Sequence, residues 1–139
     1  MACFDVDSAA IAKAAANIDD KRVRFEVADG TRLPLADASA DVYVALETIE
    51  HVLDAAGFIR EACRVLRPGG IVICSTPNRL MTNPGAGPAA KPNNPFHVRE
   101  YSVDELSSML STEFTELIWR GICQVAEVDL PALAEAGLV

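Results

Sequence analysis

Residues 41–75 read DVYVALETIEHVLDAAGFIREACRVLRPGGIVICS, which predicts a strand, a helix and a second strand in succession. The first six and the last five residues are largely apolar runs of strand length. Between them, apolar residues recur at helical spacing behind Asp54, a residue type that favours a helix N-cap. A strand, a helix and a further buried strand are typical of parallel α/β architecture. We therefore expect a parallel sheet around this stretch.

The same alternation continues on both sides of this stretch. Further predicted strands are residues 2–6, 22–27 and 114–119, and further predicted helices are residues 8–17, a helix opened by Ser102 and a short helix at 130–136. Ser102 and Glu105 have the spacing of a capping box. The sequence Pro68-Gly69-Gly70 is expected to stop the helix that precedes it. Residues 77–98, rich in proline, glycine and asparagine, are expected to form a long irregular loop. The whole chain, 1–139, is expected to form a single domain.

Charge and hydropathy exclude several classes of partner. Twelve lysine and arginine residues stand against twenty aspartate and glutamate residues, a formal net charge of −8. Proteins that grip phosphate backbones usually present a basic face, so nucleic acid is a disfavoured partner. No apolar run approaches the ~20 residues of a membrane-spanning helix, so no membrane span is expected. The N-terminus lacks the basic segment of a signal peptide, and a cytoplasmic location is expected.

Acidic residues follow two neighbouring predicted strands. Asp5 and Asp7 come after the first strand, and Asp29-Gly30 comes after the second. Ligands of open parallel sheets bind at the carboxyl ends of the strands. Two acids there can accept hydrogen bonds from the ribose hydroxyls and the adenine amino group of an adenosine. Equally, Asp7 can cap a helix and Asp29-Gly30 can form a turn, and the spacing alone does not choose between these interpretations.

A second cluster follows the strand at 41–46. Glu47, Glu50 and His51 stand at i, i+3 and i+4, so a helical turn would bring them to one face. His97, the other histidine, follows the long loop. Two carboxylates and two imidazoles can hold Mg²⁺, Mn²⁺, Fe²⁺ or Zn²⁺, with the histidines disfavouring Mg²⁺. The alternative is that Glu47 faces a cofactor, His51 is a general base or packing residue, and His97 anchors the loop.

Two long segments carry a family resemblance. VADGTRLPLADASADVYVALETIEHV (27–52), followed by FIREACRVLRPGGIVICSTPN (58–78), resembles the class I S-adenosylmethionine (SAM)-dependent methyltransferases of the type 11 kind, in an E-x-x-E-H subgroup. The resemblance implies an α/β fold, a Rossmann-like parallel sheet with helices on both faces. The family's strand and G-x-G-x-G loop have no counterpart here, so we expect the fold to be truncated at the N-terminus. The strand edges that this leaves unpaired are expected to favour self-association.

The resemblance also implies roles for individual residues. Asp5 corresponds to the acid that binds the ribose of SAM, and Val6 to the residue beside the adenine ring. Asp29, with the backbone of Gly30, corresponds to the residue that meets the adenine amino group. Leu46 occupies the place where backbone atoms approach the methionine part of the cofactor.

The chemistry implied is methyl transfer to a hydroxyl, with His51 as the base that removes the acceptor proton. The E-x-x-E-H motif with a later histidine resembles metal-dependent 2′-O-methyltransferases of small-RNA 3′ ends and ubiquinone-pathway O-methyltransferases, which implies a divalent metal at Glu47, Glu50, His51 and His97. The segment NPFHVREYS (94–102) resembles methyltransferases of bacterial glycan or lipid-linked sugar pathways. We therefore expect a small-molecule or glycan-like acceptor, covered by a lid loop at 79–98.

Two rival interpretations remain. A nicotinamide-dependent Rossmann enzyme would carry a G-x-G-x-x-G loop, which this sequence lacks. A non-catalytic methyltransferase-like fragment or interaction partner would share every motif named above, and ligand binding is what separates it from an enzyme.

Overall fold

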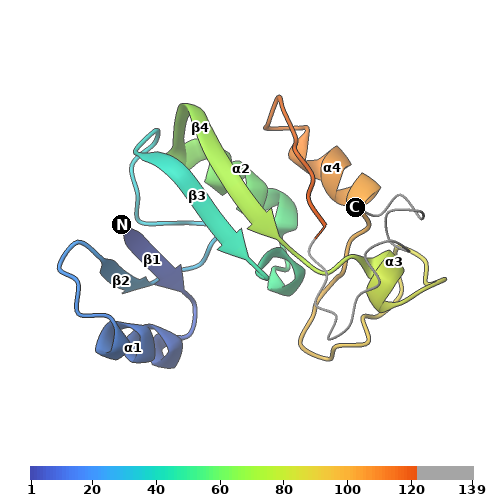
Figure 1. Cartoon of the computed structure of the whole chain (residues 1–139), viewed down its shortest axis with the longest axis horizontal. Helices are drawn as coiled ribbons and strands as arrows, with labels where there is room; N and C mark the ends of the chain where they lie inside the picture. The colour runs from blue at the N-terminus through green and yellow to red at the C-terminus, as the bar shows by residue number, and fades with distance from the viewer. Residues whose placement is uncertain (122–139) are drawn as a thin grey trace, which may run out of the picture.

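The computed structural model describes residues 1–121 of the chain (Figure 1). In chain order its elements are β1 (Ala2–Asp5), α1 (Ser8–Asn17), β2 (Arg24–Val27), β3 (Ala40–Leu46), the 3₁₀ turn η1 (Ile49–His51), α2 (Ala55–Val65), β4 (Leu66–Ser75), α3 (Arg79–Thr82) and α4 (Val103–Leu110). Strands and helices alternate, as the sequence predicts. Both views show three groups in a row: β1, β2 and α1, then β3, β4 and α2, then α3 and α4.

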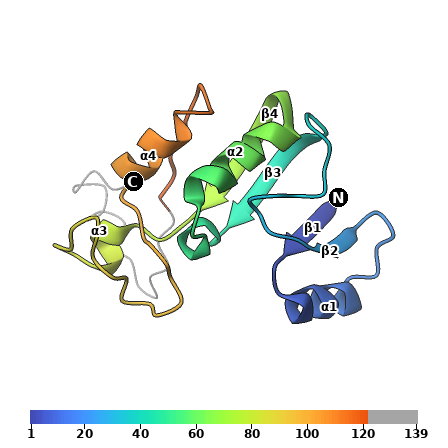
Figure 2. The same cartoon turned by 180° about the vertical axis from the view of Figure 1, so that it is seen from behind.

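The strands form two parallel pairs instead of one continuous sheet. β1 pairs with β2, and β3 pairs with β4. Figures 1 and 2 place β1 between β2 and β3, but no ladder joins β1 to β3 within residues 1–121. The Rossmann-like α/β class is confirmed. The predicted sheet is interrupted between β1 and β3.

The β3–β4 pair is covered by helices on one face only. Its register sets Val42 beside Ile71 and Val44 beside Ile73, so these four side chains share one face. Each of them is between 49% and 59% exposed, and we call this set the bare face. On the opposite face Ala45 is buried in the core. Figure 2 views the pair from this covered side, with α2 in front of the strands.

Helix α2 supplies much of the core, as its apolar spacing predicts. The Asp54 side chain caps the helix by accepting a hydrogen bond from the Gly57 N–H at 2.8 Å. The Phe58 ring meets Tyr43 of β3 edge-on, with the ring centroids 5.9 Å apart. Removal of this apolar surface from water is the main force that holds the helix against the strands. The buried members of the cluster are Ala45, Ile49, Ala55, Phe58, Ile59, Tyr101, Leu106 and Leu110.

The predicted turn Pro68-Gly69-Gly70 forms part of a strand. Helix α2 ends at Val65, and β4 begins at the next residue. The register slips here, since Ala40 pairs with Leu66 whereas Val42 pairs with Ile71. Gly69 adopts a φ of +80°, a conformation that glycine tolerates without steric cost, so the surplus residues bulge out of the ladder. The helix therefore stops earlier than predicted, and the strand is longer.

The long loop contains one short helix that the sequence did not predict. Asn78 caps α3 by accepting a hydrogen bond from the Leu80 N–H at 3.1 Å. Arg79, the first residue of α3, is buried and donates hydrogen bonds to the Ala86 carbonyl oxygen and to Glu105 of α4. These bonds hold the start of the loop against α4.

The predicted strand at 114–119 is wrong, because no regular element follows α4 up to residue 121. Phe114 and Leu117 are partly buried against the core, so the apolar run is accounted for by packing. A strand also needs a ladder partner, and none of the described strands pairs with this segment. The predicted helix at 130–136 lies outside the described residues. None of the helices in residues 1–121 has the length and apolarity that crossing a membrane requires.

The capping box at the start of α4 is confirmed. The Ser102 side chain accepts a hydrogen bond from the Glu105 N–H at 3.2 Å, and Glu105 accepts one from the Ser102 N–H at 2.7 Å. Glu105 also accepts a hydrogen bond from Arg79 at 2.8 Å. The hydrogen bond from the Ser102 N–H has the larger effect on the pKa of Glu105 and the bond from Arg79 the next largest; together they lower this pKa to about 2. The ionised carboxylate therefore joins α4 to α3.

This pKa predicts an acid-sensitive contribution to stability. Because the folded pKa lies below the unfolded value of ~4.3, the contribution is present above pH ~4.3 and is lost as the pH falls toward 2. We expect Glu105→Gln to lower the free energy of unfolding by ~2 kcal/mol at pH 6 and by about half as much at pH 3. Urea denaturation at both pH values measures this. Asp104→Asn, an exposed acid one position earlier, is the control; an equal loss at both pH values in Glu105→Gln would contradict the assignment.

Candidate functional site

The carboxyl ends of the strands lie toward one edge of the molecule. The arrowheads of β1, β3 and β4 point the same way in Figures 1 and 2. Asp5 ends β1 opposite Val27 of β2, and Leu46 ends β3 opposite Ser75 of β4. The predicted cofactor residues therefore stand in two groups. Asp5, Val6, Asp29 and Gly30 lie at the end of the β1–β2 pair, and Leu46 lies at the end of the β3–β4 pair.

Both predicted acids take part in local turns. Asp5 Oδ1 accepts a hydrogen bond from the Asp7 N–H at 2.8 Å, and Asp7 in turn caps α1 through the Ala9 N–H. Asp29 Oδ1 accepts hydrogen bonds from the N–H and the hydroxyl of Thr31, at 2.8 and 2.7 Å. Those two bonds lower the pKa of Asp29 below its ordinary value, which keeps it anionic. The turn and cap interpretations are thus confirmed for Asp29 and Asp7.

These local bonds leave the carboxylates accessible to a ligand. Asp5 and Asp29 are both exposed, and each uses Oδ1 alone in the hydrogen bonds found among residues 1–121. An exposed carboxylate oxygen held at the end of a parallel strand suits a ribose or an adenine amino group. Val6 and Leu46 are also exposed, at 69% and 59%. The residues present thus fit one wall of an adenosine site.

Gly30 is required by close packing. A Cβ atom at this position would lie 2.6 Å from Cε2 of Phe58, well inside van der Waals contact. Just after the Asp29 turn, the Leu33 N–H donates a hydrogen bond to the carboxylate of Glu61 in α2 at 2.6 Å. The turn after β2 is therefore pressed onto α2, which connects the first group of strands to the second.

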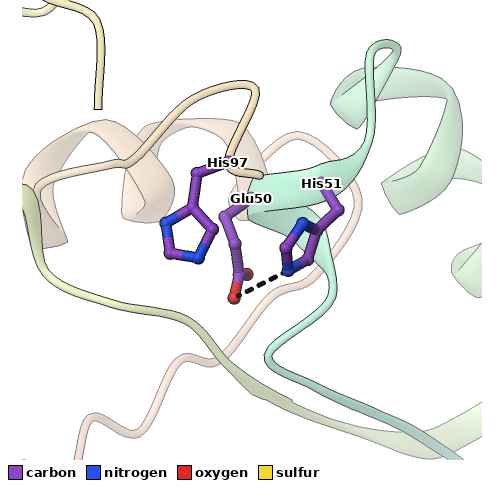
Figure 3. Close-up of side chains that lie close together, drawn as sticks. All are labelled: Glu50, His51 and His97. Carbon is purple, nitrogen blue, oxygen red and sulfur yellow. Dashed lines mark ion pairs between the residues drawn. The ribbon is translucent and has the colours of Figure 1, made fainter. Parts of the chain in front are cut away.

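Three of the four predicted metal ligands converge. One ligand atom from each of Glu50, His51 and His97 lies within 4.8 Å of the others, and Figure 3 shows the three side chains facing one another. Glu50 and His51 come from η1, whereas His97 comes from the loop that precedes α4. Glu50 is 1% exposed, while the His51 side chain is 44% exposed. The cluster thus has a buried floor and an open side.

Glu47 is not brought into this cluster. Its φ of 48° is left-handed, an uncommon conformation for a residue other than glycine, and it precedes η1. Its carboxylate accepts a hydrogen bond from the Ser75 hydroxyl of β4 at 2.7 Å. The predicted i, i+3, i+4 face needs an α-helical turn through residue 47, and the left-handed residue breaks that turn.

Each histidine uses Nδ1 in a hydrogen bond to an oxygen, which leaves Nε2 as the nitrogen with the lone pair. His51 Nδ1 lies 2.9 Å from the Phe96 carbonyl oxygen, and His97 Nδ1 lies 2.7 Å from Glu100 Oε1. A carbonyl or carboxylate oxygen accepts, so each Nδ1 is the donor. The Nε2 atom of each ring then carries the lone pair. At His97 this atom lies 2.9 Å from the Asn94 side-chain nitrogen, which donates to it.

Glu50 contributes an oxygen without a partner. Its Oε2 accepts a hydrogen bond from the Thr76 hydroxyl at 2.8 Å, whereas its buried Oε1 has no hydrogen-bond partner among residues 1–121. Oε1 lies 3.9 Å from His51 Nε2. Because a buried carboxylate oxygen left unpaired is costly, this position suits a cation. One carboxylate and two imidazoles favour Mn²⁺, Fe²⁺ or Zn²⁺ over Mg²⁺, and the residues present fit such an ion.

The loop is bonded to the same turn. The N–H groups of Val98 and Arg99 both donate to the backbone oxygen of Glu50, at 2.8 and 3.2 Å. His97 therefore belongs to a segment that Val98 and Arg99 anchor on η1, and its side chain also faces the cluster. Beside it, an open groove of about 720 Å³ runs between residues 52–56 and the loop residues 88–92.

Sequence reasoning did not single out Glu100. The signal was present, since Glu100 follows His97 at i+3 within NPFHVREYS. No such spacing is specific in a loop, and only the folded loop brings the two side chains into contact.

Comparison with known proteins identifies relatives of this sequence. Residues 1–74 match the model of a family described as a methyltransferase domain. A Mycobacterium tuberculosis protein named "Probable S-adenosylmethionine-dependent methyltransferase" is 48% identical over 99 residues, which cover 70% of this chain and 35% of the relative. The 27-O-demethylrifamycin SV methyltransferase of Amycolatopsis mediterranei is 56% identical over 55 residues, 40% of this chain and 20% of the relative. The chain thus spans about a third or less of these relatives.

Solved structures agree on the fold. The crystal structure of an S-adenosylmethionine-dependent methyltransferase from Mesorhizobium loti superposes with a TM-score of 0.69 at 20% identity, covering 99% of this chain and 72% of that one. At that identity the likeness supports the Rossmann-like α/β fold alone.

Proposed function

This chain belongs to the methyltransferase domain family, and we propose that it takes part in methyl transfer from SAM to a hydroxyl of a small-molecule or sugar- or lipid-linked acceptor. The observation that carries the proposal is the family match over residues 1–74, which contains both strand-end acids together with Glu50 and His51. The Amycolatopsis relative is named a 27-O-demethylrifamycin SV methyltransferase, and this name supports an oxygen acceptor.

The cofactor would lie against the ends of β1 and β2. When bound, SAM supplies an electrophilic methyl group on its sulfonium sulfur. Asp5 would accept hydrogen bonds from the ribose hydroxyls, with Val6 beside the adenine ring. Asp29 would accept one from the adenine amino group, next to the Gly30 backbone. These contacts orient the donor, and holding the two reactants in the reactive geometry is a major contribution that a protein makes to such a transfer.

His51 is the proposed catalytic base. Its Nδ1 donates to the Phe96 carbonyl oxygen, which holds the ring in place and leaves the Nε2 lone pair available. The open side of the cluster lets an acceptor hydroxyl reach this nitrogen. When Nε2 takes up the hydroxyl proton, Glu50 Oε1 at 3.9 Å stabilises the positive charge.

Glu50, His51 and His97 are also proposed to hold a divalent ion. Such an ion is a Lewis acid and would make an acceptor hydroxyl easier to deprotonate. His51 cannot bind an ion and accept a proton through the same Nε2, so the two roles exclude each other. The partnerless Glu50 oxygen supports the ion, and the exposure of His51 supports the base.

The loop at 79–98 is proposed as a lid over the acceptor. Its residues 88–92 form one wall of the open groove, and Val52 and Leu53 beside η1 lie on the other. An apolar wall next to His51 would hold the acceptor body while its hydroxyl meets the cluster.

Self-association is a second proposed property, linked to the non-catalytic alternative. The bare face leaves four β-branched side chains half-exposed on two strands, and the β1–β2 and β3–β4 pairs do not bond to each other. Exposed apolar faces and unpaired edges commonly serve as association surfaces. A methyltransferase-like protein whose role is to bind partners would use the same surface.

The cofactor proposal predicts binding of S-adenosylhomocysteine, the product of SAM. Asp5→Asn keeps the Oδ1 bond to Asp7 but removes the charge, so we expect affinity to fall ~10–100-fold. Isothermal titration calorimetry measures this. Asp7→Asn, which preserves the helix cap, is the control and should bind like the wild type. Absence of heat from the wild type, with or without Mn²⁺, would favour the non-catalytic alternative.

The metal proposal predicts binding of Zn²⁺ or Mn²⁺ by the isolated chain. Glu50→Ala and His97→Ala should each weaken the affinity by more than ~100-fold, because losing a ligand costs more than losing an outer partner. Equilibrium dialysis measures the affinities, and circular dichroism checks that the variants fold. Glu47→Ala is the matched control, since its carboxylate bonds to Ser75 instead. Unchanged binding in Glu50→Ala and His97→Ala would contradict the site.

The bare face predicts association at high protein concentration. Val44→Lys and Ile73→Lys place charges on this face and should shift the chain toward monomer in analytical ultracentrifugation at ~100 µM. Leu53→Lys, at a residue that is 90% exposed elsewhere, should leave association unchanged. A wild type that stays monomeric over the whole concentration range would rule the proposal out.

A further inference from the structure

Glu100 lies at the far end of the loop and joins it to its beginning. The residue is 3% exposed. Its Oε1 is 2.7 Å from His97 Nδ1, and its Oε2 accepts a hydrogen bond from the hydroxyl of Thr82, the last residue of α3. A single buried carboxylate therefore bridges the start of the loop, its end and the histidine that faces the cluster.

The bond to His97 determines which ring nitrogen is available. With the Nδ1 proton directed to Glu100, the lone pair of His97 is on Nε2, which accepts a hydrogen bond from the Asn94 side chain at 2.9 Å. Figure 3 shows this side of the ring turned toward Glu50, so an ion bound there would take the place of the Asn94 amide. Carboxylates that hold the second nitrogen of a ligating histidine fix its tautomer and raise its basicity. The His97 side chain is only 10% exposed, so water has little access to compete for these bonds.

The buried carboxylates near the cluster also favour a bound cation. Glu50 and Glu100 are both almost fully buried, and the two histidines between them each direct Nδ1–H to an oxygen acceptor. Each carboxylate lies beside one of these rings: Glu50 Oε1 is 3.9 Å from His51 Nε2, and Glu100 Oε1 is 2.7 Å from His97 Nδ1. Buried charge requires compensation, and a divalent cation balances two carboxylates.

We propose that Glu100 is a positioning residue that couples the loop at 79–98 to divalent-ion binding at Glu50, His51 and His97. Its bond to His97 Nδ1 directs Nε2 of that ring toward the ion. Its bond to Thr82 makes this orientation depend on the closed position of the loop. Binding of the ion therefore orders the loop. The inference rests on the metal site of the proposed function, and it adds the residue that transmits binding to the loop.

The affinity test uses Zn²⁺ alone, with the full chain and a competing chromophoric chelator. Glu100→Gln should weaken zinc binding ~10–100-fold, the range typical of an outer partner. Glu100→Asp keeps the charge and should restore part of the affinity. Glu113→Gln changes an acid that follows α4 and takes no part in the cluster, and it is the matched control. Equal zinc affinity in Glu100→Gln and the wild type would overturn the inference while leaving the metal site intact; a wild type that binds no zinc would overturn the metal site and the coupling together.

Two further readouts separate positioning from mere folding. In ¹⁵N NMR of the zinc-free protein, His97 should be the Nδ1–H tautomer in the wild type and lose that preference in Glu100→Ala. Chymotrypsin should cleave after Phe96, which is 80% exposed, and zinc should slow that cleavage in the wild type but much less in Thr82→Val. Equal protection by zinc in Thr82→Val would overturn the coupling through Thr82. A folded Glu100→Ala protein with the tautomer unchanged would overturn the positioning role.

Discussion

The architecture around the candidate site depends on the burial of one residue, Glu50. Its backbone oxygen accepts hydrogen bonds from two N–H groups of the returning loop, and its Oε2 is held by Thr76 just after β4. The residue itself sits in η1, directly after β3. A single buried glutamate therefore joins both strands of the central pair to the loop at 79–98. Its remaining oxygen faces the two histidines, so the same burial that organises the backbone also creates the need for a positive charge.

The two halves of the proposed chemistry stand on separate structural units. The strand-end acids belong to the β1–β2 pair, whereas the histidine cluster belongs to the β3–β4 pair and the loop. Contact between the units comes from the turn after β2, where Gly30 meets the Phe58 ring and Leu33 bonds to Glu61. Packing of that turn on α2, and not a continuous ladder, sets where the proposed cofactor wall stands relative to the cluster. Mutations in the turn would therefore alter the alignment of donor and acceptor without touching either.

The loop between β4 and α4 is more constrained than its composition suggests. Arg79 and Glu105 pair across it, and Glu100 receives bonds from both Thr82 and His97. Charged and polar contacts, many of them buried, take the place of an apolar core in this region. Such contacts lose much of their value when one partner is missing, so the proposed coupling between the loop and the cluster depends on each of them.

What the sequence determined by itself was local. The helix caps at Asp54 and Ser102, the apolar spacing of α2 and the alternation of strands and helices depend on residues within a few positions of one another, and short-range patterns record them. The tertiary structure decided the features that depend on distant partners. The run at 114–119 has the composition of a strand but pairs with none of the strands in residues 1–121. Glu47 leaves the predicted cluster because a left-handed backbone turns it toward Ser75. Glu100 contacts His97 and Thr82 only in the folded loop. Hydrogen-bond ladders and buried charges need a partner from elsewhere in the chain, and no local pattern encodes where that partner will be.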